Sequence, residues 1–458
     1  MTIFTATVPL PVSAAEAYAW HERPGAFARL CPPGGGVRVL VGTGALREDE
    51  RLELSVPWGP LHLRWTARHR DVRPGEQFSD EQERGPFTRW LHTHRFRATG
   101  AHSCDLEDRI DYQLPWGAMG RWLAGGMIER RLNRLFAHRQ RRTVSDLVRH
   151  QAERDRGRWR IAISGSCGLI GSALTAFLGS GGHQVHAVVR GGMQGRGQGQ
   201  AISWDPLSGR LDTQALAGCT AMIHLAGCPL TQARWRPAFK ELIRSSRIDA
   251  TRRLCVALAS MPEPPRVLLC ASAIGWYGDR GDQLVDESAA AGSGFLSDVC
   301  AAWEQATEPA RRAGIRVVNL RFGTVLSGDG GALAALLTPF RLGLAGRLGS
   351  GRQWLSWIAI DDAIGAIHRL LFTEDIHGAV NIVSPAPCTN AAFTAILARV
   401  LRRPAVLPLP APLVRLLLGE MGQALLLDGV RVRPAVLERL GFRFGAGTLD
   451  QALAQELP

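Results

Sequence analysis

The sequence has 458 residues, of which 46% are hydrophobic and 21% are charged, together with 51 glycines and 26 prolines. This length suits about three domains of roughly 150 residues, and the apolar content excludes a disordered chain. Lysine and arginine exceed aspartate and glutamate by 54 − 41 = 13, but Lys240 is the only lysine. Because no nucleic-acid motif accompanies the arginines, specific binding to nucleic acid is not expected.

The nine cysteines are scattered and show no CxxC spacing. Neither a disulfide framework nor a zinc knuckle is therefore expected, and this cysteine usage favours the reducing cytoplasm. The most apolar late stretch, residues 401–427, is interrupted by arginines and prolines. We accordingly predict no membrane-spanning segment and no targeting signal.

Residues 1–150 predict a module of strands followed by one long helix. Turns rich in glycine and proline separate short apolar segments, at 37–40, 52–56, 61–66 and 91–96. The apolar residues that follow fall on one face of a helix, namely Ile128, Leu132, Leu135 and Phe136. Strands curved around such a helix form a cup that holds a ligand.

His92 and His94 alternate along one predicted strand and therefore point to the same face. Two histidines at this spacing are a pattern that some metal sites show. The sequence identifies no third ligand for them. We therefore predict that they are two histidines on a strand surface and that the chain has no metal site.

The charged residues 151–158 predict a linker, because an apolar run begins abruptly after them. Between residues 159 and 400, apolar runs alternate with helical patterns, at 161–164, 184–189, 221–225, 267–271, 316–320 and 380–383. This alternation predicts an α/β domain with a parallel sheet.

The first of these runs is followed at once by the glycine pattern SGSCGLIG. In the turn from a strand to a helix, Gly165 permits the tight turn, Gly168 lets the backbone approach a pyrophosphate, and Gly171 lets helix and strand pack closely. The sequence therefore predicts a Rossmann-type doubly wound parallel sheet that binds a dinucleotide. An ordinary glycine-rich turn is the alternative.

The position that selects between NAD and NADP follows the second strand of this unit. Proteins that bind NAD usually offer an acidic residue there to the ribose 2′-hydroxyl, whereas this chain has Arg190. An arginine pairs with a 2′-phosphate. We therefore predict NADP as the cofactor rather than NAD.

Four further motifs make residues 159–458 resemble the epimerase-like family in the atypical, extended branch of the short-chain dehydrogenase/reductase superfamily. They are HLAG at 224–227, ASAIGWYGDRG at 271–281, RFGTVLS at 321–327 and the long segment 339–362. The resemblance implies cofactor contacts besides Arg190 and the three glycines, at Ser166, Leu169, Ile170, Leu225, Ala226, Gly227, Arg247 and Val325. It also implies that residues 401–458 form the C-terminal segment of unassigned function that marks the family.

Residues 1–150 resemble a START-like helix-grip domain of the polyketide cyclase type, chiefly through the run DEQERGPFTRWLHTHRF at 80–96. The resemblance implies an α+β domain with a hydrophobic cavity for a lipid or polyketide-like ligand. Fusion of such a domain to the epimerase-like family is a known arrangement.

The usual catalytic pair of the superfamily, Tyr-x-x-x-Lys, is missing. Leu296 stands at its tyrosine position and Cys300 at its lysine position. One hypothesis makes Tyr277 the proton donor and Ser272 the orienting hydroxyl. The alternative is that Tyr277 forms a wall of the cofactor pocket. Cys300 and His224 are predicted to be a buried structural thiol and a packing histidine.

Two functions follow from these predictions. In the first, the chain is an NADP-dependent oxidoreductase or epimerase-like protein acting on a hydroxyl or carbonyl group of a small or lipid-like substrate. In the second, it binds NADP with little or no turnover and couples that binding to a domain that holds a hydrophobic ligand. The missing Tyr and Lys favour the second function, and the intact glycine pattern favours the first.

Overall fold

The computed structural model describes residues 1–42, 46–58, 61–191 and 199–457. The chain divides into two compact units, residues 1–157 with 176–183, and residues 158–175 with 184–457. The division after residue 157 falls within the predicted linker, although a helix continues to Ala152. The C-terminal segment does not separate as a third unit, because residues 401–457 cluster with the sheet of the second.

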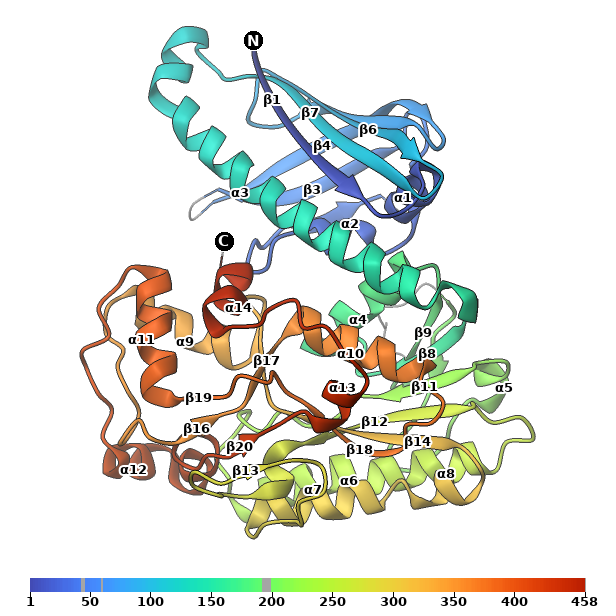
Figure 1. The fold of residues 1–458 in the computed structure, drawn as a ribbon, viewed down its shortest axis with the longest axis vertical. Helices are drawn as coiled ribbons and strands as arrows, with labels where there is room; N and C mark the ends of the chain where they lie inside the picture. Colours follow the sequence, from blue (N-terminus) through green and yellow to red (C-terminus); the bar gives the residue numbers. More distant parts are fainter. Residues whose placement is uncertain (43–45, 59–60, 192–198, 458) are drawn as a thin grey trace. The chain divides into compact units, whose positions relative to one another are not determined.

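The first unit is a seven-stranded antiparallel sheet with the order β1-β7-β6-β5-β4-β3-β2 (Figure 1). Its strands are β1 (Thr2–Leu10), β2 (Arg38–Val41), β3 (Arg51–Trp58), β4 (Leu61–Arg73), β5 (Gln77–Arg84), β6 (Arg89–Gly100) and β7 (Ser103–Gln113). Its helices are α1 (Ala14–Glu22), α2 (Ala26–Leu30), α3 (Gly117–Ala152) and the short η1 (Arg154–Arg156). The predicted order of strands followed by one long helix is therefore confirmed.

Helix α3 covers the sheet of this unit through the apolar face that the sequence predicts. Ile128, Leu132 and Phe136 are buried at intervals of four residues and pack with Ile110 and Tyr112 of β7. Such spacing places successive side chains above one another on one side of a helix. A second apolar cluster joins α1 to the other end of the sheet.

His92 and His94 are not surface residues, and that prediction was wrong. Both side chains are buried, with only 4% and 5% of their surface exposed. They lie on the face of β6 that is turned toward α3, because the His92 ring meets the Phe136 ring edge-on with 5.4 Å between centroids. On the neighbouring strand β5, Asp80 pairs directly with His92.

The second unit is a parallel sheet with the order β10-β9-β8-β11-β12-β14-β18. Its strands are β8 (Arg160–Ser164), β9 (Gln184–Val189), β10 (Ile202–Ser203), β11 (Ala221–His224), β12 (Val267–Ala273), β14 (Arg316–Phe322) and β18 (Gly378–Ile382). The chain runs outward from β8 to β10 and then crosses back to β11. The strand order thus reverses between β8 and β11, which is where doubly wound sheets bind ligands.

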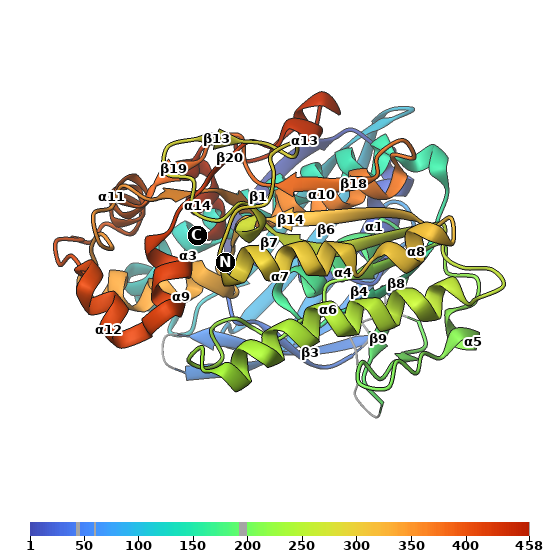
Figure 2. The same cartoon turned by 90° about the horizontal axis from the view of Figure 1, so that it is seen from below.

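Helices cover both faces of this sheet, as a doubly wound fold requires (Figure 1). The helices are α4 (Leu169–Ser180), α5 (Thr213–Leu216), α6 (Pro237–Ala259), η2 (Ile274–Tyr277), α7 (Phe295–Gln305), α8 (Glu308–Arg312), α9 (Gly331–Arg341) and α10 (Ile360–Phe372). Figure 2 shows α6, α7 and α8 together on one face. None of the helices in the described ranges has the length and apolar content needed to cross a membrane.

Short strand pairs and small helices complete the unit. The pairs are β13 (Leu284–Val285) with β20 (Arg431–Val432), β15 (Thr324–Leu326) with β17 (Trp357–Ala359), and β16 (Trp354–Leu355) with β19 (Cys388–Thr389). The helices are α11 (Asn390–Leu401), α12 (Ala411–Gly422), η3 (Gln423–Leu427), α13 (Ala435–Arg439) and α14 (Leu449–Glu456). Through these elements the C-terminal segment packs back onto the sheet unit.

One carboxylate holds the last part of this segment. Asp362, in the first turn of α10, accepts hydrogen bonds from the backbone amides of Gly445 at 2.7 Å and Ala446 at 3.0 Å. The Asp362 carboxylate and Ala446 are almost fully buried, whereas Gly445 is exposed. Asp362 thereby fixes the loop that leads into α14.

We expect Asp362→Ala to lower the free energy of unfolding by about 1–3 kcal/mol, because two backbone amides then lose their charged acceptor. Asp375→Ala is the matched control, since that carboxylate is exposed in a turn after the same helix. Urea unfolding and limited proteolysis of the C-terminal segment measure the effect. Equal stability of the two variants would contradict this role of Asp362 in holding the loop before α14.

Candidate nucleotide-binding and active site

The turn between β8 and α4 requires glycine at two positions. Gly165 has φ +74°, and a Cβ there would lie 2.9 Å from the amide nitrogen of Ala226. A Cβ on Gly171 would lie only 2.1 Å from the carbonyl oxygen of Gly165. Both distances are too short for a carbon atom, so a side chain at Gly165 would push against the segment after β11, and one at Gly171 would push α4 away from the turn. At Gly168 the closest approach is a less severe 3.2 Å.

The end of β11 lies directly against this turn. The Leu225 amide donates to the Ser164 carbonyl at 3.1 Å, and the Ser164 hydroxyl lies 2.6 Å from Nδ1 of His224. These contacts bring Leu225 and Ala226 beside Gly165. His224 is fully buried, which lowers its pKa to about 4, so a role as packing histidine accounts for it and a role as base does not.

The remaining contacts predicted for the cofactor border the same turn. Gly331 approaches both Leu169 and Val325, since a Cβ on it would lie 3.0 Å from Cδ2 of Leu169 and 3.8 Å from the Val325 carbonyl oxygen. Ser166 is buried inside the turn, and Ile170 is half-buried in the first turn of α4. The structure therefore gathers these residues at the carboxyl edge of β8 and β11.

Two arginines stand beside this edge. The guanidinium of Arg247, on α6, is within 3.5 Å of the position a Cβ on Gly227 would take, and it lies over the Trp303 ring at 5.2 Å. Burial lowers the pKa of Arg247. Arg190 is exposed directly after β9, two residues beyond Val188, which pairs with Ser164 at the end of β8.

The residues present fit a dinucleotide phosphate. The two obligatory glycines leave a backbone cradle without side chains, and α4 begins directly at that cradle, where a helix N-terminus favours an anionic group. Arg190 and Arg247 supply positive charge, whereas no acidic side chain immediately follows β9. This donor set matches a phosphate-rich ligand.

A buried polar network lies at the same edge, under β12, β14 and β18. Arg321 on β14 forms a two-pronged ion pair with Glu304 on α7, with nitrogen–oxygen distances of 2.7 and 2.9 Å. The Ser272 hydroxyl donates to Glu304 at 2.7 Å. Arg321 also donates to the Tyr277 hydroxyl at 3.0 Å, and that hydroxyl donates to Asn381 at 2.7 Å.

This network engages both residues for which a catalytic role was considered. Tyr277 is fully buried and gives its single proton to Asn381, while Ser272 gives its proton to Glu304. Burial also raises the pKa of Tyr277, which outweighs the opposing effect of Arg321. The geometry therefore supports structural roles for Tyr277 and Ser272 and gives no support to proton donation or substrate orientation.

The positions of the missing catalytic pair lie next to this network. A Cβ on Gly275 would lie 3.3 Å from Cβ of Leu296 and 3.5 Å from Sγ of Cys300, so α7 presents both residues to the end of β12. Cys300 is buried, and burial together with the charge of Glu304 raises its pKa to about 12. The thiol stays protonated, in agreement with the predicted structural role.

Glu304, Arg321 and Asn381 were not identified as site residues from the sequence, although Arg321 opens the motif RFGTVLS. Seventeen residues separate Glu304 from Arg321, and their contact arises only when α7 packs beside β14. The available signal was an arginine near the carboxyl end of a largely apolar strand. Such a residue is rarely buried without a carboxylate partner.

We expect Glu304→Gln to destabilise the sheet unit by about 3–5 kcal/mol, because it leaves the buried Arg321 cation without its carboxylate. Glu308→Gln, three residues past α7, is the matched control. Glu308 pairs with Arg311 and Arg312 at the surface, where such pairs contribute about 0.2–1 kcal/mol. Urea unfolding of both variants checks this, and similar losses for the two would refute it.

The fold and the glycine turn define the class of this chain, a Rossmann-type nucleotide-binding protein. The pattern of the NAD dependent epimerase/dehydratase family matches residues 161–382. Two further patterns flank it, Polyketide cyclase / dehydrase and lipid transport at 10–141 and a domain of unknown function, DUF1731, at 409–456. The predicted START-like domain and C-terminal segment are thereby confirmed.

Curated relatives match the second unit almost over their whole length. An epimerase family protein of Mycobacterium bovis is 43% identical over 293 residues, which are 64% of this chain and 96% of the relative. The human epimerase family protein SDR39U1 is 34% identical over 301 residues, covering 65% of this chain and 99% of the human protein. The chain belongs to this epimerase family of short-chain dehydrogenase/reductase type.

Two solved structures extend the comparison. The nucleoside-diphosphate sugar epimerase from Corynebacterium glutamicum is 33% identical with a TM-score of 0.81, covering 99% of this chain and 90% of its own. The human SDR39U1 structure, determined with NADPH, is 32% identical with a TM-score of 0.60, covering 65% of this chain and 98% of its own. The first of them matches both units of this chain.

Proposed function

We propose that this chain is an NADP(H)-dependent oxidoreductase or epimerase-like protein that acts on a carbonyl or hydroxyl group of a small or lipid-like substrate. The observation that carries the proposal is the turn at Gly165 and Gly171, packed on Leu225 and Ala226 with Arg190 at the same edge. The NADPH in the structure of the human relative supports this choice of cofactor.

Each part of the edge has a distinct task in this proposal. The amides of the glycine turn bind the pyrophosphate, and Arg190 pairs with the 2′-phosphate that distinguishes NADP from NAD. Arg247 neutralises charge beside Gly227. When bound, NADPH supplies a hydride. The chain's own contribution is to hold the acceptor carbon in line and to exclude water.

The buried network serves this function as a support. Arg321 lies against the Trp276 ring, with 3.9 Å from Cζ to the ring centroid, and Trp276 is half-buried at the end of β12. Tyr277 and Ser272 hold Arg321 and Glu304 in place. We assign Tyr277 and Ser272 as positioning residues. Their hydrogen bonds to Arg321 and Glu304 keep the Trp276 ring in place at the end of β12.

A second candidate function is binding of NADP without turnover, coupled to a hydrophobic ligand in the first unit. The observation that favours it is Leu296 and Cys300 at the positions of the catalytic Tyr and Lys. The match of residues 10–141 to a lipid transport family supports a hydrophobic ligand for the first unit. For both candidates the scattered cysteines favour a cytoplasmic location.

For cofactor binding, we expect NADPH to bind more tightly than NADH and Arg190→Ala to weaken NADPH alone, by about 10–100-fold. A lost charge-assisted contact contributes about 1.5–3 kcal/mol, which gives that range. Arg210→Ala is the matched control, since Arg210 is exposed in a turn of the same unit. Calorimetric titration of the unmodified chain and both variants with each cofactor measures this, and equal affinity of the unmodified chain for both cofactors would overturn the assignment of Arg190.

For turnover, we expect NADPH oxidation with at least one member of a panel of carbonyl compounds, and we expect Tyr277→Phe to retain it. The variant should instead lose about 1–3 kcal/mol of stability, since Arg321 and Asn381 lose a buried partner. Tyr18→Phe is the control, because the buried Tyr18 hydroxyl makes no hydrogen bond within the described residues.

Loss of turnover in Tyr277→Phe with NADPH binding intact would instead restore Tyr277 as the proton donor. NADPH binding without oxidation of any compound in the panel would favour the second candidate function. Absence of binding to either cofactor would contradict both candidates. Each of these outcomes is read from calorimetry and absorbance at the nicotinamide band.

A further inference from the structure

A cluster of histidines and carboxylates occupies the inner face of the sheet in the first unit. Asp80 on β5, His92 and His94 on β6, and Asp108 on β7 all lie on the face turned toward α3. Strand pairing brings the four residues together, because Asp80 is opposite His92 and His94 is opposite Asp108. A lipid-binding cup has no need of such groups, and the proposed function uses none of them.

The cluster separates two apolar groups of side chains. His94 stacks on Phe78 with 4.2 Å between ring centroids, and Phe78 belongs to the apolar cluster around α1. His92 meets Phe136, which belongs to the cluster under α3. Placing the buried Asp108 and the half-buried Asp80 between apolar layers costs free energy unless cations or hydrogen bonds compensate their charges.

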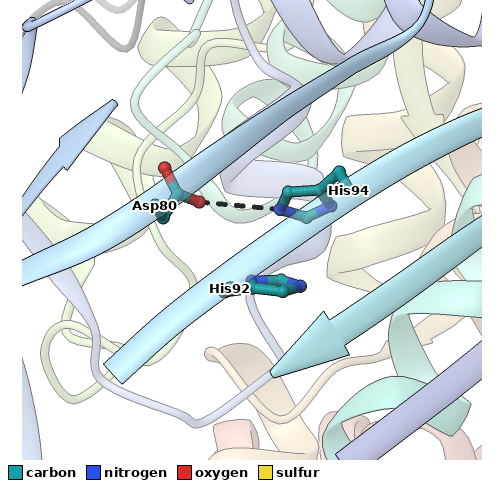
Figure 3. Close-up of side chains that lie close together, drawn as sticks. All are labelled: Asp80, His92 and His94. Atoms are coloured by element: carbon teal, nitrogen blue, oxygen red, sulfur yellow. Dashed lines mark ion pairs between the residues drawn. The ribbon is translucent and has the colours of Figure 1, made fainter. Parts of the chain in front are cut away.

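Three of these side chains have the geometry of metal ligands. One ligand atom each from Asp80, His92 and His94 lies within 4.8 Å of the other two. Oδ2 of Asp80 and Nε2 of His94 are 3.5 Å apart (Figure 3). Around Zn²⁺ with bonds of about 2.0–2.2 Å, tetrahedral ligand atoms stand roughly 3.3–3.5 Å apart.

The surroundings match the outer shell of a metal site. Oδ1 of Asp108 lies 3.0 Å from Nε2 of His92 and 2.7 Å from Nδ1 of His94. Oδ1 of Asp80 lies 2.7 Å from Nδ1 of His69, whose ring is also buried. Metal-bound histidines characteristically place their second nitrogen against a carboxylate in this way.

An independent observation concerns hydrogen bonds that are not made. Nε2 of His69, whose ring is buried and whose Nδ1 faces Asp80, has no hydrogen bond within the described residues. Buried imidazole nitrogens without partners are uncommon in folded proteins.

We propose that Asp80, His92 and His94 bind a divalent transition metal of the Zn²⁺ type inside the first unit, with Asp108 and His69 as supporting residues. Two nitrogen ligands and one oxygen ligand suit such an ion rather than Mg²⁺ or Ca²⁺. Three protein ligands leave a coordination position for water or for an oxygen of the bound ligand. The proposal is independent of the nucleotide site.

A divalent cation at this site would compensate the charge of the two carboxylates. With neutral histidines, the carboxylates of Asp80 and Asp108 carry two negative charges, which a divalent cation matches. The nearby Arg139 acts electrostatically on His92 and supplies one further positive charge. The competing arrangement is metal-free, with a protonated His94 between the two carboxylates. Burial lowers the pKa of His94, but Asp108 and Asp80 outweigh it and raise the pKa to about 9.

The test uses the full chain, stripped with a chelator and then titrated with Zn²⁺ by calorimetry. We expect one equivalent to bind and the thermal midpoint to rise relative to the chelated protein. His94→Ala and Asp80→Asn should each abolish that equivalent, and Asp108→Asn should weaken it by about 10–100-fold. His62→Ala, an exposed histidine on β4, should bind as the unmodified chain does.

Co²⁺ provides a second measurement that does not depend on the variants. Bound to nitrogen and oxygen, it should show weak visible bands without the intense near-ultraviolet band of a thiolate ligand, which distinguishes this cluster from the nine cysteines. No Zn²⁺ uptake by the unmodified chain, an unchanged equivalent in folded His94→Ala, or a thiolate band would each overturn the metal site. NADPH binding should stay the same throughout, so failure here leaves the proposed function untouched.

Discussion

The close approach of α4 to β8 is the constraint on which the second unit depends. A Cβ at Gly171 would lie 2.1 Å from the backbone oxygen of Gly165, so helix and strand meet only because neither position has a side chain. The same absence brings Leu225 and Ala226 beneath the turn and aligns the ends of β8 and β11. The backbone cradle proposed for the nucleotide therefore results from the tight packing of β8, the glycine turn and α4.

A second buried interaction organises the neighbouring edge. Glu304 and Arg321 connect α7 to β14, and Ser272, Tyr277 and Asn381 extend the connection to β12 and β18. A cation therefore does stand 3.0 Å from a tyrosine hydroxyl in this protein, although it comes from a strand and not from the helix position that carries lysine in related enzymes. Because burial still raises the pKa of that hydroxyl, the arginine stabilises the structure rather than activating the phenol.

Much of the fold was predictable because its signals are local. Apolar runs such as 161–164 and the spacing of Gly165, Gly168 and Gly171 are read within one turn of chain, and the structure confirms the sheet that they predict. The sites that were missed depend on contacts between distant positions. Asp80 meets His92 only because β5 and β6 pair in one register, and Asp362 holds amides 83 residues away.

The same dependence on contacts between distant positions applies to the first unit, for which the sequence predicts a hydrophobic cavity. The resemblance indicated the helix-grip architecture, which the strand order and α3 confirm. It did not reveal that four charged or titratable side chains occupy the inner face, because alternation in a strand gives the side on which residues lie but not what faces them. His92 and His94 were accordingly placed on the surface, and their burial at 4% and 5% corrects this.

The pairing of β6 with its two neighbours decides at once which of its side chains face the inside of the first unit. Successive residues of a strand point to opposite sides, so a shift of one residue would replace His92, His94 and Phe96 with Leu91, Thr93 and Arg95. The polar cluster and the aromatic contacts of the core would then leave together. An insertion of one residue in this strand would therefore exchange all of its inward-facing side chains at once rather than one at a time. The side chains that face a ligand inside this unit therefore depend on the same strand register that holds the domain folded.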